Sequence, residues 1–156
     1  MMVYFWPFLF FSIQFMEIFS FEPKLRILGG TECVSNYSYI VSTRIKDQTH
    51  YCGGTLVAPR WVLTAAHCLR VTLKEAVIGS NHLFPKDSEH FFRTNIIKQI
   101  RHPKFNPKSK LLRNDIALLE LEEPVFSLKV VDLPKKMLKK DITEFCKIAL
   151  VMGWGS

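Results

Sequence analysis

The chain has 156 residues, enough for one domain of ordinary size or for one domain with a fragment of a second. Hydrophobic residues make up 48% of it and charged residues 22%, which excludes wholesale disorder. The formal net charge is +7, and the lysines and arginines gather in residues 101–113 and 135–140, which are interpreted as solvated loops.

Residues 1–20 are predicted to be a secretory signal peptide. Residues 3–11 form an apolar centre of the right length, and Ser20 is a small residue at which a signal peptidase could cut. A membrane-spanning helix needs about 20 apolar residues, and a proline, a glutamine and a glutamate inside this run make a stable span costly. Because no Lys or Arg precedes the apolar centre, an uncleaved anchor is the alternative.

Short strands separated by turn residues follow, which favours an all-β sandwich or barrel. Apolar and polar residues alternate over residues 37–46, which predicts a strand with one buried face. Apolar runs of strand length occupy residues 61–63, 116–121 and 148–152, with prolines between them.

Residues 122–141 lose strand character and are interpreted as a connector. Part of this stretch, residues 135–145, also fits a short amphipathic helix, because Leu138 and Ile142 lie four positions apart. Periodicity alone leaves both interpretations open.

The most informative segments are Cys52-Gly53-Gly54 and Thr64-Ala65-Ala66-His67-Cys68. A disulfide between Cys52 and Cys68 would add about 3 kcal/mol on the chain-entropy model and would hold His67 at the end of a strand. A histidine held in this way can serve as a general base, because its near-neutral pKa is useful only once its geometry is set. Alone, His67 would more often be a structural or surface residue, but its flanking residues favour a catalytic role.

These segments resemble the trypsin and chymotrypsin family of serine proteases, whose base histidine lies in a T-A-A-H-C segment behind a C-G-G turn. Three more segments match the family in order. Arg26-Ile27-Leu28-Gly29-Gly30 resembles its activation site, Asn114-Asp115-Ile116-Ala117-Leu118-Leu119 its buried-aspartate segment, and Gly153-Trp154-Gly155-Ser156 a turn early in its second barrel. Four ordered matches argue against chance, and they cover about half of the family's domain.

The resemblance implies an all-β fold: the N-terminal six-stranded antiparallel barrel of the two-barrel chymotrypsin-like fold, plus the linker and first strand of the second barrel. It also implies a short activation propeptide at residues 21–26 and a partial peptidase domain at residues 27–156. Within that domain, the first barrel would cover residues 27–121 or so, the linker about 122–141, and the start of the second barrel 142–156.

By resemblance, His67 is the general base, and Asp115 holds its ring nitrogen and stabilises the imidazolium. Independently, an Asp that opens an apolar strand is unusual, because burying its charge costs several kcal/mol unless a partner such as His67 compensates. A turn residue after Asn114 is the alternative. The resemblance further implies cleavage after Arg26, which would free the amino group of Ile27.

The family's nucleophilic serine lies in a later G-D-S-G-G segment that these 156 residues do not contain, so by themselves they are expected to be catalytically inactive. The terminal Gly155-Ser156 lacks the following glycines and is not that segment. By resemblance, Cys33 and Cys146 would bond to later cysteines, and they are expected to be unpaired within these residues.

No metal or other cofactor is expected. Cys52, His67 and Cys68 lack the second C-x-x-C or H-x-x-x-H pair of a zinc site. In an ungapped match to the family's calcium loop, Ser80 and His90 occupy the first and last acidic positions, which argues against calcium.

The favoured function is a secreted, extracellular trypsin-like serine endopeptidase, made as a zymogen and acting on protein or peptide substrates when a C-terminal half completes it. An N-glycosylation sequon at Asn36 is compatible with secretion. The alternative is a non-catalytic short isoform or pseudoprotease that binds a protease inhibitor, a receptor or an acidic glycan. Nucleic acid is not an expected partner, because no aromatic residues alternate with the lysines.

Overall fold

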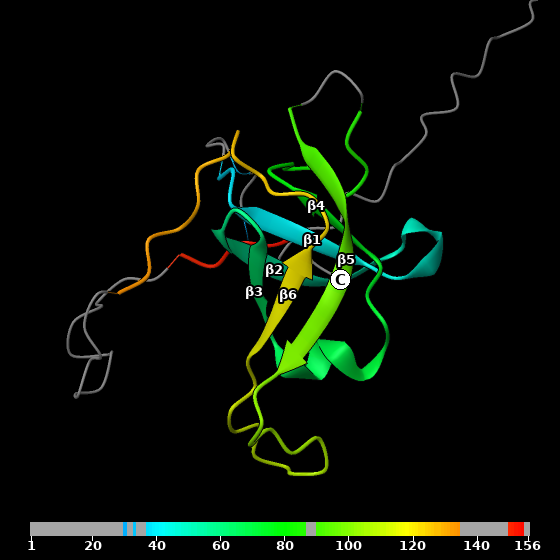
Figure 1. Ribbon diagram of the computed structural model, residues 1–156, viewed down its shortest axis with the longest axis vertical. Coiled ribbons are helices and arrows are strands. Elements are labelled where there is room, and N and C mark those ends of the chain that lie inside the picture. The colour runs from blue at the N-terminus through cyan, green and yellow to red at the C-terminus, as the bar shows by residue number, and fades with distance from the viewer. Residues whose placement is uncertain (1–29, 31–32, 34–36, 87–89, 135–149, 155–156) are drawn as a thin grey trace, which may run out of the picture.

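The computed structural model describes residues 30, 33, 37–86, 90–134 and 150–154. Six antiparallel strands close into a barrel in the order β1-β2-β3-β6-β5-β4 (Figure 1). The elements are β1 (Ile40–Arg44), η1 (Lys46–Gln48), β2 (His50–Ala58), β3 (Trp61–Thr64), η2 (Ala66–Arg70), β4 (Glu75–Ile78), β5 (Phe92–Arg101) and β6 (Ala117–Leu121), where η denotes a 3-10 helix. The predicted all-β class and six-stranded antiparallel barrel are confirmed.

The barrel is filled by side chains that alternate along its strands. In β6, Ala117, Leu119 and Leu121 are buried, whereas the two residues between them are partly exposed. Leu56 of β2 and Val62 of β3 are fully buried in the same core. Because the sheet closes on itself, each strand pairs with a neighbour on both sides. The barrel therefore has no edge strand with unpaired backbone groups.

The first strand differs from its sequence-based prediction, because both of its faces are buried. Ser42 and Arg44, expected on an exposed face, are each only 1% exposed. The Arg44 guanidinium donates to the carbonyl of Leu83, lies 3.5 Å from a carboxylate oxygen of Glu75 and approaches the ring of Phe84. The alternating pattern therefore predicts the strand correctly. It does not reveal that residues after β4 cover the polar face of that strand.

Gly53 and Gly54, expected to form a turn, lie within the long strand β2. A Cβ atom on Gly54 would lie 2.7 Å from Cγ1 of Val62 and 3.1 Å from the carbonyl oxygen of Leu63, both on the neighbouring strand β3. Glycine is needed here because the two strands approach closely, and not because the chain turns.

The described part of the predicted connector, residues 122–134, contains no helix or strand, and it is hydrogen-bonded to the end of β2 and to the residue just after it. The amide of Val125 donates to the carbonyl of Pro59 at 2.8 Å, and that of Val131 donates to Leu56 at 3.0 Å. The helix considered for residues 135–145 lies outside the described residues.

The strand predicted for residues 148–152 is not present in its described part, because residues 150–152 belong to no strand. Leu150 and Val151 are 67% and 76% exposed. An apolar run becomes a strand only when its backbone groups find a pairing partner, and none of the described strands pairs with this segment. Within the described residues, no helix is both long enough and apolar enough to cross a membrane.

Candidate active site

His67 is presented by the short helix that follows β3. The strand ends at Thr64, Ala65 continues in an extended conformation, and η2 begins at Ala66, which is completely buried. The buried residues on either side of His67 hold the backbone against the core, while the His67 side chain is 46% exposed. The imidazole is thus held through its backbone and is accessible to solvent.

The predicted disulfide between Cys52 and Cys68 is present and joins β2 to η2, with the two Cα atoms 6.2 Å apart. Cys68 directly follows His67, so the bridge restrains the helix that carries the imidazole. The sulfur atoms and the His67 ring lie within 4.8 Å of one another. Because the two sulfurs are bonded to each other, neither is available as the thiolate that a zinc ion would need.

Asp115 is brought to His67 by the pairing of β3 with β6. Thr64 at the end of β3 lies opposite Ala117 at the start of β6, so the residues just beyond these two positions meet at one end of the barrel. Asn114 has a positive φ of 56°, a left-handed conformation that asparagine tolerates better than most residues. The predicted buried-aspartate segment therefore combines a turn at Asn114 with a side chain at Asp115 that contacts His67.

Both carboxylate oxygens of Asp115 are bound to His67. The imidazole Nδ1 lies 2.7 Å from Oδ2, and the backbone amide of His67 donates to Oδ1 at 2.8 Å. The hydrogen bond from the His67 side chain lowers the pKa of Asp115 below its ordinary value, and backbone hydrogen bonds from His67 and Ala66 act in the same direction against the effect of burial. Asp115 is consequently ionised at neutral pH and accepts both bonds.

This geometry selects one tautomer of the imidazole. An ionised carboxylate only accepts hydrogen bonds, so in the neutral ring Nδ1 carries the proton and Nε2 carries the lone pair. A ring held in this form can take a proton at Nε2, and the adjacent carboxylate stabilises the imidazolium that results. The sequence-based placement of His67 beside Asp115 agrees with the structure, and the arrangement is suited to general-base chemistry.

The segment compared with a calcium loop has no acidic side chain at its two expected positions. Ser80 is buried, and its hydroxyl lies 2.9 Å from both the carbonyl and the amide of His82. His90 is exposed at the other end of the segment. A hydroxyl that caps its own turn and an imidazole do not provide the carboxylate oxygens that calcium prefers.

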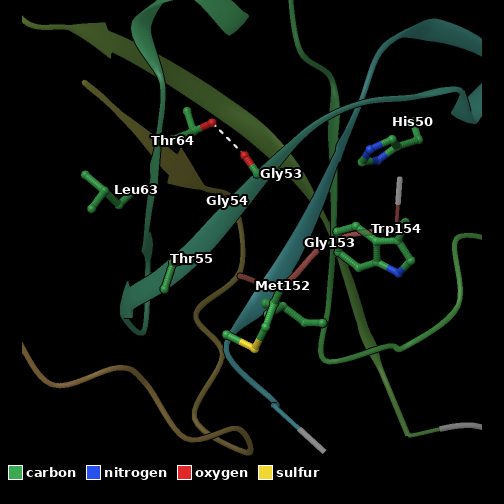
Figure 2. Close-up of a pocket in the computed structure, with 10 residues that line it drawn as sticks. His50, Gly53, Gly54, Thr55, Leu63, Thr64, Met152, Gly153 and Trp154 are labelled. Carbon is green, nitrogen blue, oxygen red and sulfur yellow. Dashed lines mark hydrogen bonds between the residues drawn. The ribbon is translucent and has the colours of Figure 1, made fainter. Parts of the chain in front are cut away.

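A second feature near the barrel was not found from the sequence. A hollow of about 460 Å³ lies between β2 and residues 152–154 (Figure 2). The rings of His50 and Trp154 meet edge to face with centroids 5.4 Å apart, and the hydroxyl of Ser42 lies 2.8 Å from Nδ1 of His50. Burial, followed by the charge of Arg44, lowers the pKa of His50. No local motif marks His50, because Ser42 meets it only through the pairing of β1 with β2 and Trp154 comes from a distant part of the chain.

The remaining predicted site residues are less completely described. Cys33 is exposed. The activation junction at Arg26 and Ile27, the sequon at Asn36, Cys146 and residues 155–156 lie outside the described residues.

Comparison with known proteins agrees with this geometry. The family model for trypsin matches residues 27–156. The chain is 37% identical over 147 residues to chymotrypsin-C of Bos taurus, which covers 86% of this chain and 52% of the relative. It is 35% identical over 135 residues to granzyme M of Homo sapiens, with 83% and 49% covered. For trypsin-3 of Homo sapiens the identity is 31% over 137 residues, with 87% and 42% covered.

The chain thus spans about half the length of the curated relatives it matches. The matched region contains the whole described barrel and both residues of the His67–Asp115 pair. This chain belongs to the trypsin family of serine proteases.

Proposed function

We propose that the whole protein is a secreted serine endopeptidase and that these residues carry its general base. The observation that carries the proposal is the 2.7 Å contact between Nδ1 of His67 and Oδ2 of Asp115. In this role Nε2 of His67 removes the proton of a serine hydroxyl as that oxygen attacks the peptide carbonyl. His67 then returns the proton to the leaving amine, while Asp115 remains ionised and stabilises the imidazolium.

In this proposal the nucleophilic serine and the oxyanion donors belong to a part of the whole protein outside these 156 residues. Loss of the nucleophile from an enzyme of this type lowers turnover on the order of a million-fold, so the 156-residue chain alone should not hydrolyse peptides. Protein or peptide substrates follow from the family's chemistry.

Secretion and zymogen activation are part of the same proposal. The Cys52–Cys68 disulfide supports an oxidising compartment, since such bridges persist mainly in secreted and extracellular proteins. The apolar N-terminal residues and the Arg26-Ile27 junction support a signal peptide and a cleavage that releases an Ile27 amino group. Sequencing the N-terminus of the protein recovered from culture medium, before and after limited trypsin treatment, tests both points.

The decisive experiment begins with the transcript beyond the codon for Ser156. If it encodes a G-D-S-G-G segment, the complete protein is expressed, activated and assayed on a peptide library, beside His67→Ala and His90→Ala. We expect His67→Ala to lower kcat by at least 10³-fold on general-base grounds, whereas His90→Ala, an exposed histidine at the far end of β5, should remain fully active.

Two results would reject the proposal. One is a stop codon after Ser156 in every transcript, which would favour the alternative of a non-catalytic binding protein. The other is a completed protein whose hydrolytic activity is unchanged by His67→Ala, because the observed pair would then have no catalytic role.

A further inference from the structure

A second pocket lies at the same end of the barrel as the His67–Asp115 pair. It has a volume of about 400 Å³ and is formed where the end of η2 meets the end of β5. Two of its lining residues are arginines, Arg70 from η2 and Arg101 from β5, and the hydroxyl-bearing Thr72 also lines it. Figure 1 shows η2 and the loop between β5 and β6 at this end of the molecule.

The two arginines differ in their freedom to bind a ligand. Arg101 donates to the carbonyl of Leu69 and so helps to build the wall of the pocket. Arg70 is exposed, and no described residue forms an ion pair or hydrogen bond with its guanidinium. A guanidinium that lies beside a pocket and has no carboxylate partner can bind an anionic group, because its planar N–H donors match the two oxygens of a carboxylate.

Positive charge continues from this pocket along the loop between β5 and β6. The loop bears four exposed basic side chains, Lys104, Lys108, Lys110 and Arg113. Asp115 is the only acidic residue between Arg101 and Ala117, and both of its oxygens are engaged by His67. No described salt bridge neutralises any of these basic groups, so this end of the barrel carries a net positive field.

The pocket and the catalytic pair are connected by two short paths. His67 and Arg70 lie three residues apart in η2, with a kink at Leu69 between them. On the other wall, Arg101 pairs with Ala117, and Asp115 lies two residues before Ala117. A polypeptide bound at His67 would therefore pass within side-chain reach of Arg70.

Exposed apolar residues accompany the basic ones. Leu111 and Leu112 lie between Lys110 and Arg113 and are 65% and 50% exposed, and Ile116 beside Asp115 is 44% exposed. A peptide with both acidic and apolar side chains can satisfy such a surface. A sulfated glycan could pair with the charges but has no apolar side chains to cover the leucines, so the combination favours a peptide.

We propose that the Arg70–Arg101 pocket and the adjoining basic loop form a binding site for an acidic segment of a peptide substrate, with an Asp or Glu carboxylate held by Arg70. This deepens and rests on the proposed function, because it names the substrate class that the same site would favour. Binding itself needs no nucleophile and can be measured on the full 156-residue chain.

The test is fluorescence anisotropy with two labelled peptides of equal length, one of alternating Glu and Leu and one of alternating Gln and Leu. Arg70→Gln is compared with Arg60→Gln, which removes the same charge from an exposed position at the opposite end of β3. At about 0.15 M ionic strength, we expect the Glu peptide to bind about tenfold more tightly than the Gln peptide. Arg70→Gln should abolish that difference, and Arg60→Gln should preserve it.

Arg70→Lys provides a second variant, because it keeps the charge but loses the two-donor geometry; it should retain part of the preference. Far-UV circular dichroism verifies that all variants are folded. Four results would overturn the inference: equal binding of both peptides, no binding of either, equal losses in Arg60→Gln and Arg70→Gln, or Arg70-dependent binding of heparin without binding of the Glu peptide. The last result would identify the surface as a glycan site.

The two proposals fail in different ways. If the completed protein hydrolyses Glu-containing and Gln-containing peptides equally well, the acidic-substrate inference is overturned and the protease function stands. If the 156-residue chain binds the Glu peptide through Arg70 but the completed protein hydrolyses nothing, the protease function is rejected and the binding site stands.

Discussion

Asp115 holds His67 by two atoms of the same residue, the backbone amide at 2.8 Å and the imidazole Nδ1 at 2.7 Å. The amide contact fixes the start of η2, and the imidazole contact fixes the ring that η2 carries. One carboxylate thus couples the fold of the helix to the orientation of the imidazole. Because both bonds are stronger to an ionised carboxylate than to a protonated one, the stability of this end of the barrel should depend on pH.

Asp115→Asn is expected to destabilise the chain at neutral pH and to have a smaller effect in acid. The pKa of Asp115 is lowered in the folded state, so its stabilising contribution is complete above the ordinary pKa and is lost as the pH falls through the lowered value. Urea unfolding of both proteins between about pH 7 and pH 3 measures the difference. A difference that stays constant across this range would show that the charge of Asp115 contributes nothing.

Removal of the Cys52–Cys68 bridge should lower the free energy of unfolding by about 3 kcal/mol on the chain-entropy model. The double variant Cys52→Ala/Cys68→Ala is compared with the unmodified chain in urea, each with and without a reducing agent. Reduction should weaken the unmodified chain and leave the double variant almost unchanged. Equal effects of the reducing agent on both proteins would assign the stabilisation to another cysteine.

Gly54→Ala should destabilise the barrel by about 1–3 kcal/mol, because the new Cβ would lie 2.7 Å from Cγ1 of Val62 and the strands would have to separate. Gly53→Ala is the matched control, since no atom lies within 4 Å of a Cβ at that position. Thermal unfolding followed by circular dichroism separates the two. Equal losses at both positions would show that the cost comes from the glycine backbone and not from the contact between β2 and β3.

Glu75→Gln should destabilise the chain by about 1–3 kcal/mol, because the buried Arg44 guanidinium would lose the carboxylate that lies 3.5 Å away. Glu122→Gln is the control: Glu122 is exposed and accepts a hydrogen bond from Asn95, which a glutamine oxygen can also accept. Urea unfolding at neutral pH is the measurement. An equal, small loss for both variants would mean that the carbonyl of Leu83 is a sufficient partner for the buried Arg44 guanidinium.

Much of the candidate site was predictable because its signals are local. His67 is followed directly by Cys68, and the disulfide partner Cys52 belongs to the same short region of sequence. Asp115 was indicated by its place at the start of an apolar strand, where an isolated carboxylate would be costly to bury. The resemblance to the trypsin family joined these separate signals into one pair, and the two residues are in contact in the structure.

Other features depend on contacts between residues that are distant in the sequence. Arg44 looked like the exposed position of an alternating strand, yet Leu83 and Glu75 surround it after folding. An apolar run at residues 148–152 suggested a strand, but its described part has no pairing partner among the described strands. In both cases the pattern of residue types belongs to one segment alone. Its burial and hydrogen bonding depend instead on which other segments pack against it.

By itself, the sequence determined the all-β class and the likeness to the trypsin family. It also singled out His67, Asp115 and the Cys52–Cys68 bridge, because each lies in a short motif or at a spacing that matches the family. Only the tertiary structure decided that Asp115 binds His67 through both oxygens and that Arg70 and Arg101 line one pocket. The physical reason is barrel closure: it brings the end of β3 beside the start of β6 and the end of η2 beside β5, and sequence distance carries no record of either approach.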